Sequence, residues 1–120
     1  MMIGIDTVVV SRLAEAVKDE AFLRRVYTAR ERAYCDGRAR PCESYAGLFC
    51  AKEATVKALK CGFLHGIAPT DIEITNDTEG APVLVMHGKA AELLAGRTAE
   101  VSISHDGDRA VAAVLITSDK

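Results

Sequence analysis

The sequence predicts one α+β domain, in which a mostly antiparallel sheet packs against one long helix and several shorter helices. Its 120 residues match the size of a single domain, and 49% hydrophobic with 27% charged residues is typical of a folded globular chain. A β-branched segment comes first, helical patterns follow, and strand patterns occupy the end of the chain. Strands that follow the helices as a group favour α+β over alternating α/β. We therefore expect residues 1–120 to form one domain.

The first third of the chain predicts a strand and two helices. Residues 2–10 are apolar and β-branched, which is typical of a strand, and residues 12–27 have the spacing of a helix. Thr28-Ala29-Arg30-Glu31 is a capping box, because the threonine oxygen can accept an amide N–H while the glutamate reaches back to the cap. A short helix should follow to about Cys35.

The longest helix should run from about Pro41 to Lys60. Proline suits the first helical turn, and Gly62 supplies a residue at which the helix can end. An apolar stripe with helical spacing contains Tyr45, Phe49, Val56 and Leu59.

The last part of the chain predicts two pairs of strands separated by a short helix. A loop that ends in Gly80 indicates the first hairpin, and Asp106-Gly107-Asp108 indicates a tight turn in the second. The expected elements are strands at 71–75, 81–87, 100–105 and 110–117 and a helix at 88–95.

Charge and composition exclude several classes of protein. A net charge of −2 and a pI of about 5.9 argue against nucleic-acid binding, and the chain has no apolar run that could span a membrane. The start of the chain has no basic leader before its apolar stretch, so we expect a cytoplasmic protein with reduced cysteines and no zinc site. The four cysteines are Cys35, Cys42, Cys50 and Cys61.

The charge is distributed unevenly. Residues 12–40 hold eight basic and five acidic residues, so this segment carries +3 and the remainder carries −5. A local basic surface on an acidic protein is suited to a specific acidic partner, although a solvated helical face gives the same pattern.

Asp6 is the first candidate for chemistry. It interrupts an apolar, β-branched strand, in which aspartate is disfavoured. Burial of its carboxylate is costly unless the group is paired or binds a metal ion. The alternative is a structural aspartate that caps a turn or lies on an exposed edge.

Glu53 and Lys57 are the second candidate. They are four residues apart in the long predicted helix, so their side chains share one face. An ordinary surface pair has the same spacing, but this helix is otherwise apolar and rich in small residues. A carboxylate and an ammonium group here could hold magnesium and a phosphate together, because magnesium takes one or two carboxylates plus substrate phosphates.

The third candidate is the segment Val101-Ser102-Ile103-Ser104-His105-Asp106. Neighbouring side chains of a strand point to opposite faces, so adjacent Ser104, His105 and Asp106 do not make a hydrolase triad. The structural alternative is a strand with one polar face and a histidine near a turn.

Together and in this order, these features resemble holo-acyl-carrier-protein synthases, the small phosphopantetheinyl transferases. The resemblance covers nearly the whole chain. It is carried by Ile3-Gly4-Ile5-Asp6 with Arg12, by Phe22 through Glu31, by Ala51-Lys52-Glu53-Ala54, by Asp71-Ile72-Glu73-Ile74, by Gly80-Ala81-Pro82 and by Ile103-Ser104-His105-Asp106.

The resemblance implies a reaction. Phosphopantetheine would pass from coenzyme A to a serine of an apo acyl carrier protein, and adenosine bisphosphate would leave. It also implies a magnesium-dependent cytoplasmic enzyme that is homotrimeric, with its active site between subunits.

The resemblance further implies residue roles. Asp6 and Glu53 would bind magnesium, and Lys57 would contact the phosphates of coenzyme A. Gly62 lies in the turn that approaches the coenzyme, while Ser104 and His105 would help hold its nucleotide end. Glu53, directly or through a magnesium-bound water, would be the base. Arg12 and Arg25 match basic positions that dock the acidic carrier protein.

The chain departs from the family pattern at three places, of which two lose a cation and one loses a glycine. Leu48 stands where the family has arginine, Ala81 stands where it has lysine, and Lys60-Cys61-Gly62-Phe63 has one glycine in place of two. These changes suggest altered coenzyme affinity or carrier choice, as in an enzyme of a specialised fatty-acid or polyketide pathway. Two alternatives to the enzyme are a non-catalytic coenzyme A-binding subunit and a purely structural interaction protein.

Overall fold

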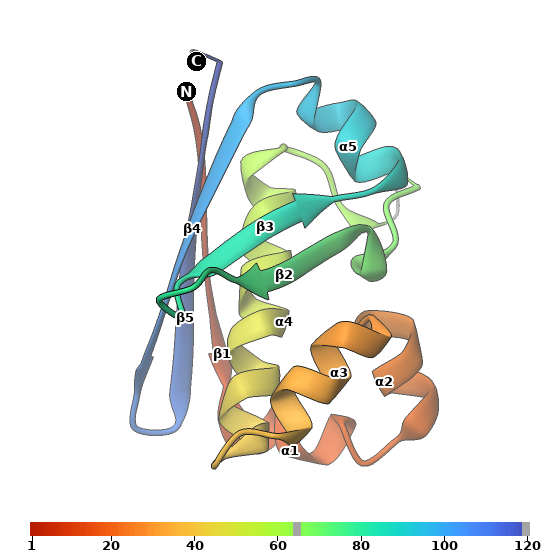
Figure 1. Cartoon of the computed structure of the whole chain (residues 1–120), viewed down its shortest axis with the longest axis vertical. Helices are drawn as coiled ribbons and strands as arrows, with labels where there is room; N and C mark the ends of the chain where they lie inside the picture. Colours follow the sequence, from red (N-terminus) through yellow and green to blue (C-terminus); the bar gives the residue numbers. More distant parts are fainter. Residues whose placement is uncertain (64–65, 119–120) are drawn as a thin grey trace.

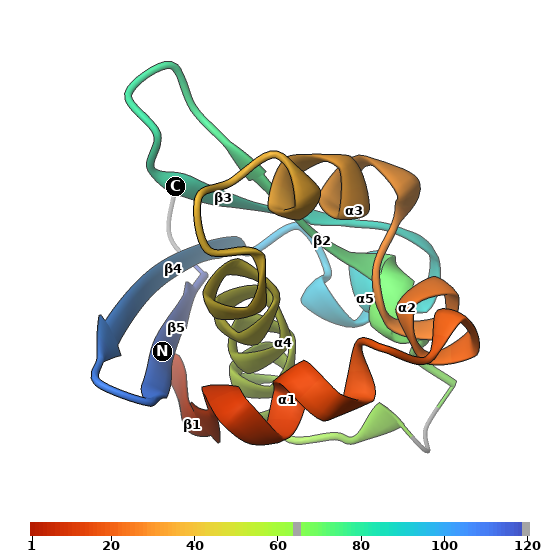
Figure 2. The same cartoon turned by 90° about the horizontal axis from the view of Figure 1, so that it is seen from below.

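The long helix α4 (Pro41–Ala58) organises the fold. In a computed structural model, described for residues 1–63 and 66–118, α4 packs across a three-stranded sheet, and the other helices and a hairpin surround its remaining sides (Figures 1 and 2). The other helices are α1 (Val10–Ala16), α2 (Glu20–Val26), α3 (Ala29–Asp36) and α5 (Gly88–Leu94), and a short 3-10 turn is η2 (Pro69–Asp71).

The strands form two sheets, and both are antiparallel. The larger sheet has the order β1-β5-β4, and the smaller is the β2–β3 hairpin. The predicted α+β class is thus confirmed, and the strands divide between two sheets. The strands are β1 (Met2–Val9), β2 (Ile72–Asn76), β3 (Pro82–Met86), β4 (Thr98–Asp106) and β5 (Arg109–Thr117).

Small residues bring α4 into direct contact with the sheet. Ala54 and Ala58 of α4 are fully buried, and both lie against Gly4 of β1. A Cβ added at Gly4 would overlap the carbonyl oxygen of Ala54 and lie 2.6 Å from the nitrogen of Ala58. The backbones of β1 and α4 therefore touch, and no side chain fits between them.

The expectation of one helix over residues 12–27 is wrong. Two helices, α1 and α2, occupy this stretch, with a break at Val17–Asp19. Asp19 begins α2, because its side chain accepts a hydrogen bond from the Ala21 N–H at 2.9 Å. An aspartate oxygen that satisfies a free amide starts a new helix instead of continuing the old one. That competing signal was present in the sequence.

The capping box at α3 is confirmed and leads into a buried ion pair. Thr28 Oγ1 accepts from the Glu31 N–H at 3.1 Å, and Glu31 Oε1 accepts from the Thr28 N–H at 2.9 Å. The same Glu31 oxygen lies 2.9 Å from Lys52 Nζ, and both side chains are buried. One glutamate thus begins α3 and neutralises a lysine of α4.

The end of α4 differs from the prediction. The left-handed residue there is Lys60, with φ of 60°, and not Gly62. The Lys60 N–H donates to the Lys57 carbonyl, and the Cys61 N–H donates to the Val56 carbonyl, both at 3.1 Å. These bonds close the last turn before the chain reaches Gly62.

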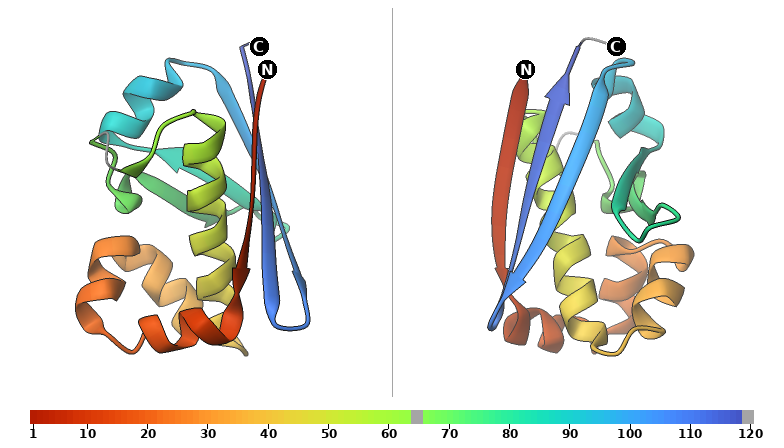
Figure 3. Two further views of the ribbon diagram at one scale, coloured as in Figure 1. Left: turned by 180° about the vertical axis from the view of Figure 1, so that it is seen from behind. Right: turned by 60° about the vertical axis from the view of Figure 1, so that its left-hand side comes forward.

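The outer face of the larger sheet is uncovered by the described residues. Side chains alternate along β1, so Gly4 and Asp6 face α4 while Ile3 and Ile5 face outward. Ile3 is 70% exposed and Ile5 is 60% exposed, and Leu115 of β5 lies opposite Ile3. Figure 3 (right) shows the three strands in front of α4. In the same described part of the chain, no helix is both long and apolar enough to cross a membrane.

Candidate active site

Asp6 and Lys57 meet where α4 crosses β1. Lys57 Nζ donates to Asp6 Oδ1 at 2.9 Å and to the carbonyl oxygen of Ile5 at 3.1 Å. Glu53 lies one turn before Lys57 on the same face of α4 and is half-buried. The structure therefore brings Asp6, the first candidate from the sequence, together with Glu53 and Lys57, the second.

Burial and neighbouring charges affect Glu53 and Lys57. Burial raises the pKa of Glu53, the negative charge of Asp6 raises it further, and Lys57 opposes both effects. The hydrogen bond with Asp6 is the main cause of a raised pKa at Lys57. This region therefore combines a carboxylate with an elevated proton affinity and an ammonium group that stays charged.

Cys50 fixes the backbone beneath this cluster. Its thiol donates to the carbonyl oxygen of Asp6 at 3.0 Å, and the side chain is fully buried. Burial, followed by the charge of Asp6, raises the pKa of Cys50 to about 12, so the thiol stays neutral at physiological pH. The contact of Cys50 with Asp6 is a feature that spacing in the sequence did not reveal.

The donor set at this crossing fits a magnesium ion. Within residues 1–63 and 66–118, no three histidine, cysteine or acidic side chains gather closely enough to hold a metal by themselves. Asp6 and Glu53 supply two hard oxygen ligands, and magnesium commonly binds through one or two carboxylates while waters and substrate phosphates complete its shell. The effect of the Asp6 charge on Glu53 is the kind that a divalent cation relieves.

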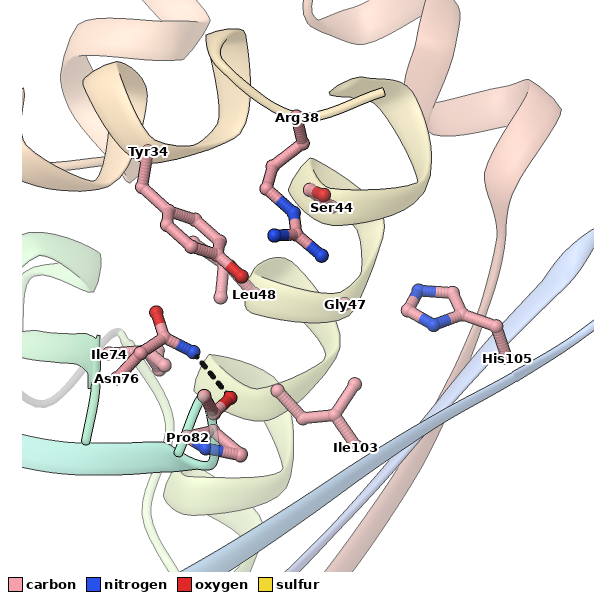
Figure 4. A pocket seen from close by; sticks show the side chains of 11 residues that line it. Tyr34, Arg38, Ser44, Gly47, Leu48, Ile74, Asn76, Pro82, Ile103 and His105 are labelled. Carbon is pink, nitrogen blue, oxygen red and sulfur yellow. Dashed lines mark hydrogen bonds between the residues drawn. The ribbon is translucent and has the colours of Figure 1, made fainter. Parts of the chain in front are cut away.

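A pocket of about 180 Å³ lies on the other side of α4, against β4 (Figure 4). Arg38 and His105 point into it, and the Arg38 guanidinium carbon is 5.3 Å from the centre of the Tyr34 ring. None of the side chains that line this pocket is acidic. The lining is therefore suited to a ligand that has both a flat ring and negative charge.

His105 is held at this pocket by the first turns of α4. Its Nε2 lies 2.8 Å from the carbonyl oxygen of Glu43, and its ring packs against Gly47. Ser104, the residue before His105 on β4, is exposed and faces away from it, as strand alternation requires. Of the two strand residues predicted to hold a nucleotide, only His105 lies in the pocket.

The pocket and the carboxylate cluster lie at opposite edges of one sheet. Asp6 is on β1 and His105 is on β4, with β5 between them, so two strand spacings, roughly 10 Å, separate their strands. Figure 2, which looks along α4, shows β1 and β4 at the two edges of the sheet that packs on one side of this helix. Gly62 lies beyond the end of α4, outside both groups.

Arg12 and Arg25 flank an aromatic groove next to the carboxylates. The groove has a volume of about 440 Å³ and is lined by Arg12, Phe22 and Phe49, among others. The guanidinium carbon of Arg25 lies 5.7 Å from the centre of the Phe22 ring. Phe49 is four residues before Glu53, so this groove opens one helical turn from the carboxylate cluster.

Several residues of these sites were missed in the sequence. Their side chains converge from segments far apart in the chain, and no local spacing connects them. Excess arginine in residues 12–40 was the only signal for part of this set. The missed residues are Tyr34, Arg38, Ser44 and Asn76 in the pocket and Arg109 in the groove.

Comparison with known proteins gives the class first. Residues 2–114 match the family model of the 4'-phosphopantetheinyl transferase superfamily, so the chain belongs to this superfamily.

Its relatives then define the group within that class. The chain is 41% identical to the holo-[acyl-carrier-protein] synthase of Koribacter versatilis (strain Ellin345), with 94% of each protein covered, and 42% identical to that of Syntrophus aciditrophicus (strain SB), covering 94% of this chain and 92% of the relative. The Helicobacter pylori synthase in complex with coenzyme A superimposes with a TM-score of 0.87 at 32% identity, covering 97% of this chain and 100% of that one. The chain is thus a member of the holo-[acyl-carrier-protein] synthase family.

Proposed function

We propose that this protein transfers phosphopantetheine from coenzyme A to a serine of an apo acyl carrier protein and releases adenosine bisphosphate. The observation that carries the proposal is the meeting of Asp6, Glu53 and Lys57 one helical turn from a groove flanked by arginines. The solved Helicobacter pylori and Bacillus anthracis relatives are both described in complex with coenzyme A.

The proposed chemistry follows from the charges at this crossing. The serine oxygen forms a bond to a pyrophosphate phosphorus, its proton passes to Glu53 directly or through a water, and the bond to the departing adenosine bisphosphate breaks. The raised pKa of Glu53 suits it to accept this proton near neutral pH. Asp6 and Glu53 would hold magnesium, which stabilises negative charge on phosphoryl oxygens when bound. Lys57 supplies a further positive charge to the phosphates.

The nucleotide end of coenzyme A is assigned to the pocket that contains His105. Arg38 offers nitrogen donors to a phosphate, and the Tyr34 ring offers an aromatic surface for a base. Leu48 also lines this pocket, at the position where the family has arginine. Arg38 is the cation present in its place.

The carrier protein is assigned to the groove between Arg12 and Arg25. An acidic helix would pair with these guanidinium groups while its apolar side chains contact Phe22 and Phe49. Such docking places a serine of the carrier close to Glu53. The +3 charge of residues 12–40 supports an acidic partner.

A homotrimer with shared active sites fits the separation of the two sites. Within one chain, the carboxylate cluster lies at the β1 edge of the sheet and the nucleotide pocket lies at the β4 edge, so a neighbouring copy that brings its pocket to this cluster would complete a site. The exposed Ile3, Ile5 and Leu115 offer an apolar surface beside β1 for such contact. Light scattering of the purified protein, compared with Ile5→Lys, tests this assembly; a monomeric parent protein would contradict it.

The proposed compartment is the cytoplasm. All four cysteines are free thiols in the structure, which is the state that a reducing compartment maintains.

Intact mass spectrometry of apo carrier proteins tests the reaction. A panel that includes fatty-acid and specialised-pathway carriers is incubated with coenzyme A and magnesium, with chelator and with Glu53→Gln as controls. We expect a gain of one phosphopantetheine that is lost in both controls. Coenzyme A binding without any mass gain would instead support the non-catalytic binding subunit.

A further inference from the structure

Lys57 forms an ion pair with one of the two carboxylates, that of Asp6, and this pair is partly exposed to solvent. Its ammonium group contacts Asp6 Oδ1 and the Ile5 carbonyl, and its side chain is 54% exposed. Among the described residues, Glu53 has no cation within ion-pair distance. The cluster therefore holds one internal cation, and it is placed asymmetrically on Asp6.

An ammonium group and a divalent cation cannot share this place. Two positive charges a few ångströms apart repel, and both would compete for the Asp6 carboxylate. A surface ion pair is weak, and the long lysine side chain can swing into solvent at little cost. Lys57 would thus leave Asp6 when a divalent cation arrives, and its charge would then be free to meet an anion.

We propose that Lys57 is an exchangeable counter-ion of Asp6, which weakens the binding of a divalent cation to the free protein and couples that binding to the arrival of the phosphates. The inference rests on the proposed binding of the cation by Asp6 and Glu53. The cation would displace the Lys57 ammonium from Asp6, and the phosphates of coenzyme A would then pair with this ammonium. Binding of either ligand therefore increases the affinity of the protein for the other. Lys57 thereby acts as a positioning residue that favours joint loading of the two ligands.

Binding of manganese to the protein without coenzyme A tests the first half of the proposal. The electron paramagnetic resonance signal of free Mn²⁺ reports the bound fraction without any need for turnover. We expect Lys57→Met to bind Mn²⁺ about three- to fivefold more tightly than the parent protein, as loss of a weak competing ion pair allows. Lys57→Arg, which keeps the cation, should bind as weakly as the parent. Lys60→Met controls for the removal of a nearby lysine that is not paired with Asp6.

Binding of manganese with coenzyme A present tests the second half. In the parent protein the coenzyme should tighten Mn²⁺ binding, and in Lys57→Met this gain should be at least threefold smaller. Unchanged Mn²⁺ affinity in Lys57→Met, together with an unchanged coenzyme effect, would overturn the inference. Glu53→Gln separates this outcome from failure of the proposed site: if Glu53→Gln and the parent protein bind Mn²⁺ equally, the carboxylates do not hold the cation at all.

Discussion

Two lysines of α4, five residues apart, form ion pairs of the same length in opposite surroundings. Lys52 Nζ lies 2.9 Å from Glu31 Oε1, with side chains 1% and 0% exposed, whereas Lys57 Nζ lies 2.9 Å from Asp6 Oδ1, with side chains 54% and 16% exposed. Lys52 also donates to the carbonyl oxygens of Pro69 and Ile72. Lys52 thus has a complete set of acceptors in the interior, and Lys57 does not.

The difference shows how one helix serves both stability and chemistry. Burial lowers the pKa of Lys52 while Glu31 opposes that shift, so this lysine depends on its partner to remain charged in the core. A buried charge without its partner is costly, which fixes α4 against α3 and β2. A partly solvated pair tolerates exchange, and exchange is what a ligand site requires.

Removal of Lys52 gives the largest expected effect. Lys52→Met leaves the Glu31 carboxylate buried without a cation, so we expect a loss of about 3–5 kcal/mol in the free energy of unfolding, measured with urea. The double variant Lys52→Met/Glu31→Gln should recover part of this loss, because it leaves no isolated charge. A loss below about 1 kcal/mol in the single variant would remove the energetic contrast between the two lysines.

A Glu53 variant tests whether the region around the exposed Lys57–Asp6 pair is specialised for chemistry. Glu53→Gln should reduce carrier modification about 100-fold or more, because a positioned general base contributes this much. Its stability should stay within about 0.5 kcal/mol of the parent, since no described ion pair depends on Glu53. Glu92→Gln on α5 is the matched control. Equal activity in the two variants would contradict the assignment of Glu53.

Glu73 provides an intermediate case for pH. Hydrogen bonds from the Thr28 hydroxyl, and then from His87, lower the pKa of Glu73 below its ordinary value of 4.5, against the effect of burial. Its contribution to stability is therefore complete above that value and is lost as the pH falls through the lower folded pKa. Glu73→Gln should remove about 1 kcal/mol of this acid-dependent loss, measured by urea unfolding from pH 6 to pH 3. An unchanged pH profile would show that the Thr28 contact contributes little.

Lys57 is expected to give the smallest effect on stability. Lys57→Met should change the free energy of unfolding by less than about 1 kcal/mol at low salt, and the difference should shrink at about 0.5 M salt because solvent ions screen an exposed pair. The loss in Lys52→Met should not depend on salt in this way. A salt-insensitive loss of several kcal/mol at Lys57 would place it with Lys52 as a structural residue.

Much of the fold could be predicted because local signals and tertiary structure agree. The Thr28–Glu31 box begins α3 as predicted, and the strands near both turns lie within two residues of their predicted positions. The single helix over 12–27 failed because Asp19 offered a stronger local bond than continuation of the helix. The choice of Gly62 as the residue at which α4 ends failed, because the left-handed residue is Lys60 and the preference of glycine for this backbone is only a tendency.

The candidate site was predictable only where its residues are local or strongly unusual. Asp6 in an apolar strand and Glu53 with Lys57 at helical spacing gave such signals, and the structure brings them together. Tyr34, Arg38 and Asn76 meet His105 only through the packing of α3, the hairpin and β4 on α4. The opposite orientation of Ser104 and His105 follows from the strand period, but which of them faces α4 depends on register.

At Gly4 the strand and the helix touch, and these two elements also carry Asp6 and Glu53. The close contact at Gly4 therefore sets the distance between the two carboxylates. Magnesium requires ligand oxygens at about 2.1 Å, whereas calcium accepts about 2.3–2.6 Å. A methyl group at position 4 would force the two backbones apart and move the carboxylates of Asp6 and Glu53 away from each other. In the proposed site, Gly4 would therefore determine which size of ion binds, although it lies two residues away from Asp6.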